Sequence, residues 1–389
     1  MPIKSMKKKV LVAMDSMKGC LDSYHASLWV AVGLMDEWPE AEVTYTPVSD
    51  GGEGMTDMVA AGRKDVELCD CKVKGPLGKN VEASWLKRKQ DNGLCAYIDF
   101  ASAAGLTLIE EAQRNPMKTT SYGVGQMIKK AVREGISEVV LGLGGSATVD
   151  AGLGALQALG LRLLDKNGNE LPRPFTGGML GDIADLEITE HFKKNISVLK
   201  LTLLCDVKAP FTGEDGAARV FGPQKGADPQ TVELLEQGME RVRQLIQRKT
   251  GTDLNACPGS GAAGGAAGGL MAFAGGMIKK GASTLLDLIG FDNDIDDVDL
   301  IITGEGASDR QTLMGKLPFE ILQRGKKKNI PVWLVTGRIK DKEALLEAGF
   351  ERVICINSPD IVARSMTLGR DPMDSEVAAR RLSSIITSQ

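Results

Sequence analysis

EVVLGLGGSATVDAGLG, residues 138–154, decides the fold class of this chain, because it joins a short apolar run to a glycine-rich turn. The apolar residues 138–141 are typical of a buried strand, and residues 150–160 are expected to form a helix. A glycine-rich turn between a strand and a helix exposes backbone N–H groups at the positive end of the helix dipole. We therefore expect an anion site here, to which Ser146 and Thr148 could add hydroxyl donors.

Two other interpretations of this turn stay open. Its hydroxyl side chains could simply cap the following helix, with no ligand involved. Gly142, Gly144 and Ala147 also fit the pattern G-x-G-x-x-[GA], with Asp165 as a ribose-binding acid, which would make the chain an NAD-dependent dehydrogenase. That spacing alone is a weak signal. No G-x-x-x-x-G-K-[ST] sequence occurs, so a P-loop fold is not supported.

Other apolar runs rich in Val, Ile and Leu predict buried parallel strands. They alternate with helical patterns at 23–36, 312–328, 340–348 and 374–386. This alternation predicts an α/β fold with a doubly wound, flavodoxin-like or Rossmann-like parallel sheet. The strands are expected at Lys9–Met14, Glu42–Val48, Val298–Thr303, Pro331–Thr336 and Arg352–Ile356.

Chain length predicts two domains, because 389 residues exceed the size at which one hydrophobic core usually stops growing. Residues 1–70 and 295–389 together would complete one sheet, and we expect them to form a discontinuous Rossmann-like domain. Residues 71–294 hold most of the glycines and are expected to form an inserted glycine-rich α/β domain. Ligand sites favour clefts between domains, so the active site is expected in this one.

Composition and charge argue against several classes of function. The formal net charge of −4 is too weak to gather nucleic acid. The uncharged segment Leu254–Ile278 consists mainly of Gly and Ala, and is too weakly apolar for a membrane span. Seven scattered cysteines without metal-ligand spacing, and an N-terminal apolar run too short for a signal peptide, favour a cytoplasmic protein. The oligomeric state, a homo-oligomer included, stays open.

Charged side chains follow several of the predicted strands, and the carboxyl ends of parallel strands share one edge of a sheet. They are Asp15 and Lys18, Asp50 and Glu53, and Glu305, Asp309 and Lys316, with Lys225 in the expected insertion. Lysines and amides neutralise phosphate oxygens, while carboxylates hold Mg²⁺ or accept the proton of an attacking hydroxyl. The set therefore favours phosphoryl transfer, although each residue alone could be a solvated or capping group.

A second glycine-rich stretch, PGSGAAGG at 258–265, allows two interpretations. It could open a helix whose exposed amides bind phosphate, or its small residues could serve close packing against a neighbouring segment.

Motifs along nearly the whole chain resemble those of the bacterial glycerate kinase family, which acts in sugar-acid and glyoxylate catabolism. They are DSMKG, VSDGGEGMTD, GLGGSATVDAGLG, CDVKAPFTGEDGAARVFGPQKGA, PGSGAAGG and ITGEGASDRQTLMGK. The resemblance implies two α/β domains around a cleft, and a kinase that uses ATP and Mg²⁺ to convert D-glycerate to 2-phosphoglycerate. It implies a small-molecule substrate, D-glycerate or a related hydroxy acid, with neither nucleic acid nor membrane as a partner.

The resemblance implies which positions belong to the site, and we assign their individual roles from the chemistry of each residue type. Catalytic roles fall on Lys18, Asp206, Asp309 and Lys225, with Asp206 or Asp309 as the base. Substrate binding falls on Asp15, Ser16, Asp50, Gly51, Gly52, Glu53, Gln224 and Lys316. Nucleotide binding falls on Gly144, Gly145, Ser146, Ala147, Thr148, Gly259, Gly261, Gly264, Gly265, Thr303 and Gly304. Glu305 and Asp150 are the expected metal ligands.

Several positions depart from the family pattern. Ala307 stands where the family has Arg, and Val149 and Ala151 stand where it has Asn and Gly. If the missing Arg binds the carboxylate of glycerate, its loss would shift substrate choice, although Arg310 or Arg338 could compensate. Two alternatives therefore stay open: a kinase for another small sugar acid, and a sugar-acid-binding protein without turnover.

Overall fold

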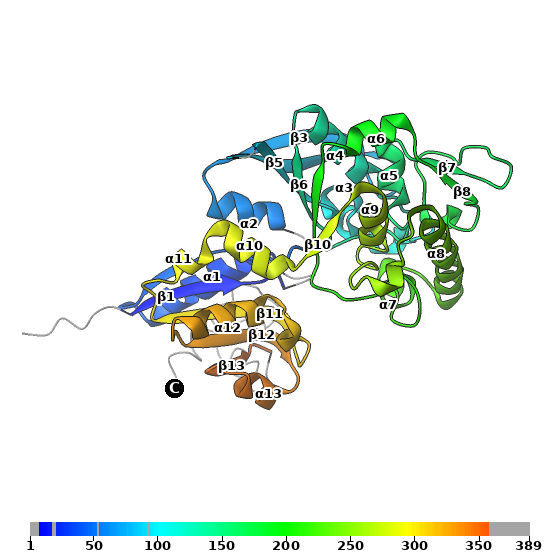
Figure 1. Ribbon diagram of the computed structural model, residues 1–389. Coiled ribbons are helices and arrows are strands. Elements are labelled where there is room, and N and C mark those ends of the chain that lie inside the picture. Colours follow the sequence, from blue (N-terminus) through cyan, green and yellow to red (C-terminus); the bar gives the residue numbers. More distant parts are fainter. Residues whose placement is uncertain (1–7, 18–20, 53, 92, 358–389) are drawn as a thin grey trace, which may run out of the picture. The chain divides into compact units, whose positions relative to one another are not determined.

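The structure is a computed structural model, and it describes residues 8–17, 21–52, 54–91 and 93–357. Contacts divide the chain into two compact units. The first unit comprises residues 1–50, 57–64 and 282–389, and the second comprises residues 51–56 and 65–281. In Figure 1 the first unit runs from blue at the start of the chain to yellow and orange near its end, and the second is mainly cyan to green. The predicted domain boundaries at residues 70 and 295 stay a prediction.

The first unit is built on a parallel sheet of five strands in the order β13-β12-β11-β1-β2 (Figure 1). The predicted doubly wound α/β class is thereby confirmed for this unit. Pro47, which has no N–H group to donate, lies within the expected strand 42–48, and β2 ends before it. The strands are β1 (Lys9–Met14), β2 (Glu42–Tyr45), β11 (Leu300–Ser308), β12 (Val332–Ile339) and β13 (Arg352–Cys355).

The helices predicted at 23–36 and 340–348 are present in the first unit, and the helix predicted at 312–328 is divided in two. The expected helix 312–328 is split into a 3₁₀ turn at Thr312–Met314 and a later helix, because Gly315 has a φ of 104° and ends the first segment. The helices are α1 (Ser23–Glu37), α2 (Met55–Gly62), α10 (Gly281–Ile289), α11 (Phe291–Asp294), α12 (Leu317–Lys327) and α13 (Lys342–Glu347). The helix expected at 374–386 lies outside the described residues.

The second unit is built on a mixed sheet of six strands in the order β10-β9-β6-β5-β4-β3. The pairs β3/β4 and β4/β5 are antiparallel, and the other three are parallel. Its strands are β3 (Val66–Lys74), β4 (Asn80–Gln90), β5 (Gly93–Asp99), β6 (Glu138–Gly142), β9 (Lys200–Leu204) and β10 (Met277–Lys279). A small antiparallel pair, β7 (Arg162–Leu164) and β8 (Asp185–Glu187), lies apart from this sheet.

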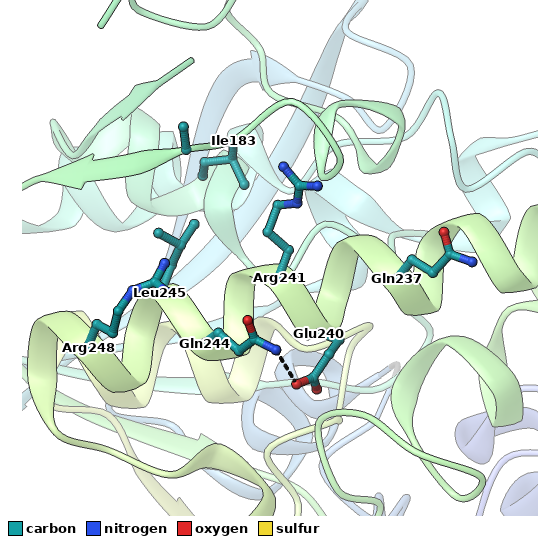
Figure 2. Close-up of a pocket in the computed structure, with 8 residues that line it drawn as sticks. Ile183, Gln237, Glu240, Arg241, Gln244, Leu245 and Arg248 are labelled. Atoms are coloured by element: carbon teal, nitrogen blue, oxygen red, sulfur yellow. Dashed lines mark hydrogen bonds between the residues drawn. The ribbon is translucent and has the colours of Figure 1, made fainter. Parts of the chain in front are cut away.

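The helices of the second unit bury a large apolar core against its sheet. They are α3 (Ala101–Ala104), α4 (Tyr122–Arg133), α5 (Leu153–Leu159), α6 (Glu190–Ile196), α7 (Ala217–Phe221), α8 (Pro229–Thr250) and α9 (Ala266–Ala274). One side of α8 lines a surface cavity of about 420 Å³ (Figure 2). In the described part of the chain, no helix combines the length and apolarity that a membrane crossing requires.

Candidate active site

The glycine-rich turn after β6 is longer than the sequence suggests. Helix α5 begins at Leu153, three residues later than the expected start at Asp150. Ala151 and Gly152 have φ angles of 58° and 68°, in the left-handed region, and this keeps them out of the helix. Ala151 stands where the resemblance led us to expect glycine, and it adopts a backbone conformation that favours glycine.

The tip of this turn presents unused backbone donors. Gly145 is exposed and has a φ of 68°. The turn is held at its base, since the N–H of Leu106 donates to the carbonyl of Gly145 at 2.9 Å and the N–H of Ala147 donates to Ala104 at 2.8 Å. The N–H groups of residues 144, 145 and 146 have no hydrogen-bond acceptor among the described residues. Successive N–H groups without acceptors can bind an anion where they point to the same side of the backbone.

Lys225 lies beside this turn with its side chain buried. It ends the 3₁₀ helix Pro223–Lys225 and is only 2% exposed. Its Nζ donates to the hydroxyl of Ser146 at 2.9 Å and to the carbonyl of Thr148 at 2.7 Å. Burial lowers the pKa of this ammonium to about 7, although the charge of Asp150 acts in the opposite direction. Lys225 therefore holds the turn in place through these two hydrogen bonds and supplies positive charge beside it. The neighbouring Gln224 is exposed.

Asp150, one of the two expected metal ligands, has both carboxylate oxygens engaged by the protein. Oδ2 accepts hydrogen bonds from the N–H and the hydroxyl of Ser121, each at 2.7 Å, and Oδ1 accepts one from the N–H of Gly152 at 3.0 Å. Complete burial raises the pKa of this carboxyl group, and the hydrogen bonds oppose that rise. These contacts make Asp150 a group that holds the turn before α5.

The second glycine-rich stretch packs directly on the first. A Cβ atom at Gly264 would lie 1.9 Å from the carbonyl oxygen of Thr148, and one at Gly269 would lie 2.1 Å from that of Ala151. A Cβ at Gly261 would meet the carbonyl oxygen of Pro210 at 2.1 Å. The N–H of Ala151 donates to Gly264 at 3.0 Å, so the two backbones touch and are bonded. Close packing, one of the two interpretations left open by the sequence, accounts for these glycines.

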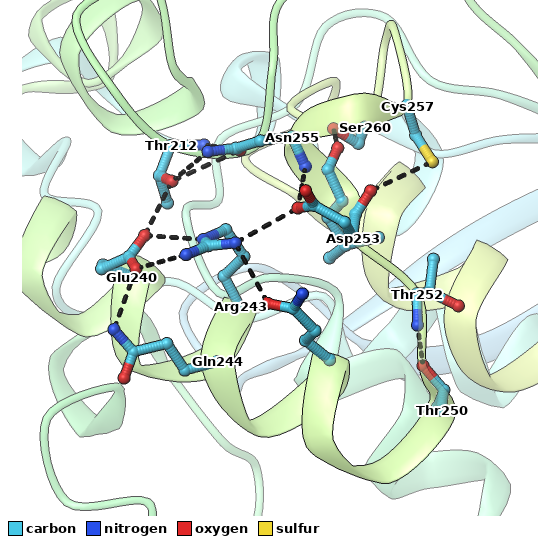
Figure 3. Close-up of polar contacts among 12 residues, drawn as sticks. Thr212, Glu240, Arg243, Gln244, Thr250, Thr252, Asp253, Asn255, Cys257 and Ser260 are labelled. Atoms are coloured by element: carbon cyan, nitrogen blue, oxygen red, sulfur yellow. Dashed lines mark hydrogen bonds and ion pairs between the residues drawn. The ribbon is translucent and has the colours of Figure 1, made fainter.

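A polar network joins α8 to the segment that precedes this second stretch (Figure 3). Glu240 of α8 accepts two hydrogen bonds from Arg243, both at 2.8 Å, and one from the hydroxyl of Thr212 at 3.0 Å. Arg243 also donates to Asp253 at 3.2 Å, and Asn255 accepts from the N–H of Thr212 at 3.0 Å. The Arg243 guanidinium is the main reason why the pKa of Glu240 falls to about 2.

Replacing Glu240 by glutamine is expected to lower the free energy of unfolding at pH 7 by about 1 kcal/mol, a small value because the carboxylate is 37% exposed. The pKa of Glu240 is depressed from 4.5, so its contribution is complete above pH 4.5 and is lost as pH falls toward 2. Urea unfolding at pH 7, 5 and 3.5 should show the difference between the two proteins shrinking at pH 3.5. Glu190→Gln, whose carboxylate is 88% exposed, is the control, and a loss independent of pH would contradict this account.

In the first unit, site residues gather at the carboxyl ends of β1 and β11. Asp15 follows β1, and its N–H donates to the carbonyl of Gly304 in β11 at 2.9 Å. Its own Oδ1 accepts from the N–H of Ser16 at 2.7 Å. Glu305 is 8% exposed, and Lys316 lies 3.4 Å from its Oε2. The structure therefore brings the predicted residues Asp15, Ser16, Gly304, Glu305 and Lys316 to one edge of this sheet.

Hydroxyl groups orient the Glu305 carboxylate. Its Oε1 accepts from Thr312 at 2.5 Å and from Ser308 at 3.1 Å. The hydroxyl of Thr303, two residues earlier on the same strand, is buried and has no hydrogen-bond partner among the described residues. Asp309 is half-buried, and its Oδ1 accepts from the N–H of Gln311 at 2.8 Å.

An arginine side chain lies opposite Ala307, the position at which the resemblance led us to expect an arginine. Ala307 in β11 pairs in register with Arg338 in β12, and both residues are exposed. Arg310, the other arginine considered from the sequence, lies 3.7 Å from Asp341 instead. Of these two arginines, Arg338 is therefore the one that lies across from Ala307.

The remaining predicted residues are distributed over both units. Asp206 follows β9 in the second unit, and its Oδ1 accepts from the N–H of Gly281 at 3.0 Å. Gly51 belongs to the same unit, where a Cβ would lie 2.9 Å from Cβ of Leu204. Gly52 follows it, whereas Asp50 ends the first segment of the first unit. Lys18 and Glu53 lie outside the described residues. Within those residues, no group of three His, Cys, Asp or Glu side chains is arranged to hold a metal.

Two polar residues near the turn were not anticipated. Asp99, at the end of β5, is 6% exposed and accepts from the hydroxyl of Thr56 at 2.8 Å, and a Cβ at Gly142 would lie 3.3 Å from its Oδ1. Ser121 binds Asp150 as described above. An acid at the end of the apolar run 94–98 was a signal available for Asp99, but the partner of Ser121 is set only by the tertiary fold.

These features define an α/β protein in which a glycine-rich turn lies beside a buried lysine, a combination that kinases of small molecules use to bind phosphate. The chain belongs to the glycerate kinase family, whose sequence profile matches residues 10–381. The resemblance stated from the motifs is thereby confirmed, and the family favours a kinase over a dehydrogenase.

Relatives in other organisms show the same similarity over nearly their full length. Glycerate 2-kinase of Escherichia coli K12 is 36% identical over 333 residues, which is 86% of each chain. Glycerate kinase of Halalkalibacterium halodurans is 35% identical over 96% of this chain and 97% of that protein. A crystal structure named for a glycerate kinase 2 of Salmonella typhimurium LT2 has a TM-score of 0.74 and 33% identity, covering 98% of this chain and 99% of its own.

Proposed function

We propose that this protein transfers the γ-phosphoryl group of ATP to the 2-hydroxyl of D-glycerate, with 2-phosphoglycerate as the product. The observation that carries this proposal is the turn at residues 144–146, whose N–H groups have no acceptor among the described residues and which lies beside the buried ammonium of Lys225. The names of the similar proteins, glycerate kinase and glycerate 2-kinase, support the substrate and the position of transfer.

The residues of the turn would bind phosphate oxygens of the nucleotide. These backbone N–H groups would need little rearrangement when the phosphate binds, because hydrogen bonds that join residues 145 and 147 to the segment 104–106 already hold the turn in place. Lys225 would contribute positive charge from beneath, and a bound phosphate would raise its pKa again, since an opposite charge favours the ammonium form. Ser146, whose hydroxyl is held by Lys225, could turn its own proton toward the same anion.

Both acids have their oxygens engaged by the protein, but Glu305 is the better candidate for Mg²⁺, because its Oε2 makes only a 3.4 Å contact with Lys316, whereas the completely buried Asp150 accepts bonds of 2.7–3.0 Å on both oxygens. A metal at Oε2 of Glu305 would displace Lys316, and the hydroxyl of Thr303, without a partner among the described residues, is a second oxygen ligand on the same strand. Carboxylate and hydroxyl oxygens are the protein ligands that Mg²⁺ accepts. When bound, the metal neutralises charge on the transferred phosphoryl group.

The carboxylate of glycerate requires a cation, and we assign this role to Arg338. Its position opposite Ala307 returns a guanidinium to the strand edge from which the family's arginine is missing. A guanidinium moved from one strand to its neighbour changes the angle of a bidentate contact, so a related hydroxy acid remains the second candidate substrate.

Phosphorus NMR of a mixture of D-glycerate, ATP, Mg²⁺ and the enzyme tests the proposal. A 2-phosphate is attached to a CH group and gives a doublet, whereas a 3-phosphate is attached to a CH₂ group and gives a triplet. We expect the doublet together with ADP. Binding of glycerate without ADP release would instead support a sugar-acid-binding protein, and turnover with another hydroxy acid alone would reassign the substrate.

We expect one of the two variants Asp206→Ala and Asp309→Ala, the one that removes the general base, to lower kcat by about 10²–10⁴-fold with little change in KM. A general base acts on the proton of the attacking hydroxyl only during transfer, so binding of the ground state depends less on it. Steady-state kinetics of both variants identify the base, and Asp165→Ala, in an exposed turn beside β7, serves as the control. Unchanged kcat in both variants would rule out both assignments.

A further inference from the structure

The cavity on α8 lies away from every residue assigned above. It has a volume of about 420 Å³ and opens between α8 and the segment that carries Ile183 (Figure 2). A volume of this size suits a small organic molecule. The lining residues are Ile183, Ala184, Gln237, Glu240, Arg241, Gln244, Leu245 and Arg248.

Two arginines give the lining of this cavity more positive than negative charge, although the carboxylate of Asp185, on the segment next to it, interacts with Arg248. Arg241 and Arg248 are both exposed, and in the described ranges neither forms an ion pair. Glu240, the acidic residue of the lining, is already neutralised by Arg243 through two hydrogen bonds of 2.8 Å. Since guanidinium groups bind carboxylates and phosphates through paired hydrogen bonds, an anion is the ligand that suits this lining.

The arrangement of the two arginines indicates two anionic groups on one ligand. Arg248 lies seven positions after Arg241, which corresponds to about 10 Å along the helix axis. Leu245 and Ile183 line the floor of the cavity with only 3% and 0% of their surface exposed, and Figure 2 shows Arg241 directed toward the segment of Ile183. Gln237 and Gln244 add amide donors that can reach ligand oxygens.

We propose that this cavity binds a small organic bis-anion, in which a short uncharged carbon chain separates two phosphate or carboxylate groups. Arg241 binds one anionic group, Arg248 binds the other, and the carbon chain lies against Leu245 and Ile183. The site does not depend on the proposed kinase reaction, because none of its residues takes part in that reaction.

Isothermal titration calorimetry with fructose 1,6-bisphosphate as the probe tests this site, with inorganic phosphate as the probe that carries a single anionic group. We expect the bisphosphate to bind at least about tenfold more tightly than phosphate, because it engages both arginines at once. Arg241→Ala and Arg248→Ala should each weaken binding of the bisphosphate about tenfold, which is the usual effect of losing a hydrogen bond to a charged group.

Arg133→Ala, an exposed arginine on α4 outside the cavity, is the matched control and should leave the affinity unchanged. Circular dichroism should show unchanged melting of both cavity variants, since the two side chains are exposed. The absence of measurable binding by the bisphosphate would overturn the proposal, as would binding that neither cavity variant weakens. Kinase activity is measured separately, so failure here leaves the proposed reaction untouched.

Discussion

Lys225→Met is expected to lower kcat/KM for ATP-dependent phosphorylation by about 10²–10³-fold, the effect of removing one preorganised donor from a transition-state anion site. Methionine keeps an unbranched apolar side chain of similar length, so the packing around the stem is largely retained. The substitution removes the cation and leaves two buried acceptors, the Ser146 hydroxyl and the Thr148 carbonyl, without their donor. Steady-state kinetics with ATP as the varied substrate measure the loss.

A matched control separates this effect from a general loss of charge. Lys166→Met removes a lysine from the exposed turn after β7, and should leave kcat/KM unchanged. Ser146→Ala removes one of the two acceptors of Lys225 while the ammonium stays, so a smaller loss of about tenfold is expected. A Lys225→Met protein that melts as the wild type does and retains kcat/KM within threefold would show that the buried ammonium plays no part in the reaction.

The sequence predicts the anion turn but not its internal geometry. Strand, glycine turn and helix follow from local periodicity, and these elements are present at β6 and α5. The start of the helix was placed too early, because the left-handed φ angles of Ala151 and Gly152 depend on contacts with the second glycine stretch, which lies more than a hundred residues later. An alanine in that conformation carries no local signal.

Long-range partners explain what else the sequence could not provide. Lys225 is recognisable as a site residue, yet its hydrogen bonds reach back 79 and 77 residues to the turn. From the sequence alone, Asp150 could equally be a metal ligand or an acid that stabilises the fold. The structure shows that it accepts a hydrogen bond from Ser121, 29 residues earlier in the sequence. Residue type predicts that a group is polar and important, but only the fold decides whether its oxygens face a ligand or the protein.

Gly264→Ala is expected to destabilise the protein by about 3–4 kcal/mol, because the methyl group would have to enter space that backbone already fills. The φ of Gly264 is +65°, a conformation that costs an alanine about 1–2 kcal/mol by itself. Its Cβ would also lie 1.9 Å from the carbonyl oxygen of Thr148 and 2.7 Å from Cα of Val149, and neither atom can move without shifting the anion turn. Urea unfolding at pH 7 measures the loss.

Gly251→Ala is the matched control, because Gly251 ends α8 with a φ of +75° and a Cβ there would have no heavy atom within 4 Å. It carries the same conformational cost without the clash, so a loss of only about 1 kcal/mol is expected. The difference between the two variants isolates the contact between the two glycine stretches. Since the clash pushes on Thr148, an acceptor of Lys225, Gly264→Ala should also reduce kcat/KM where the protein remains folded, and Gly251→Ala should not. Equal losses of stability in the two variants would mean that the two backbones can separate, and that the turn does not need its neighbour to hold its shape.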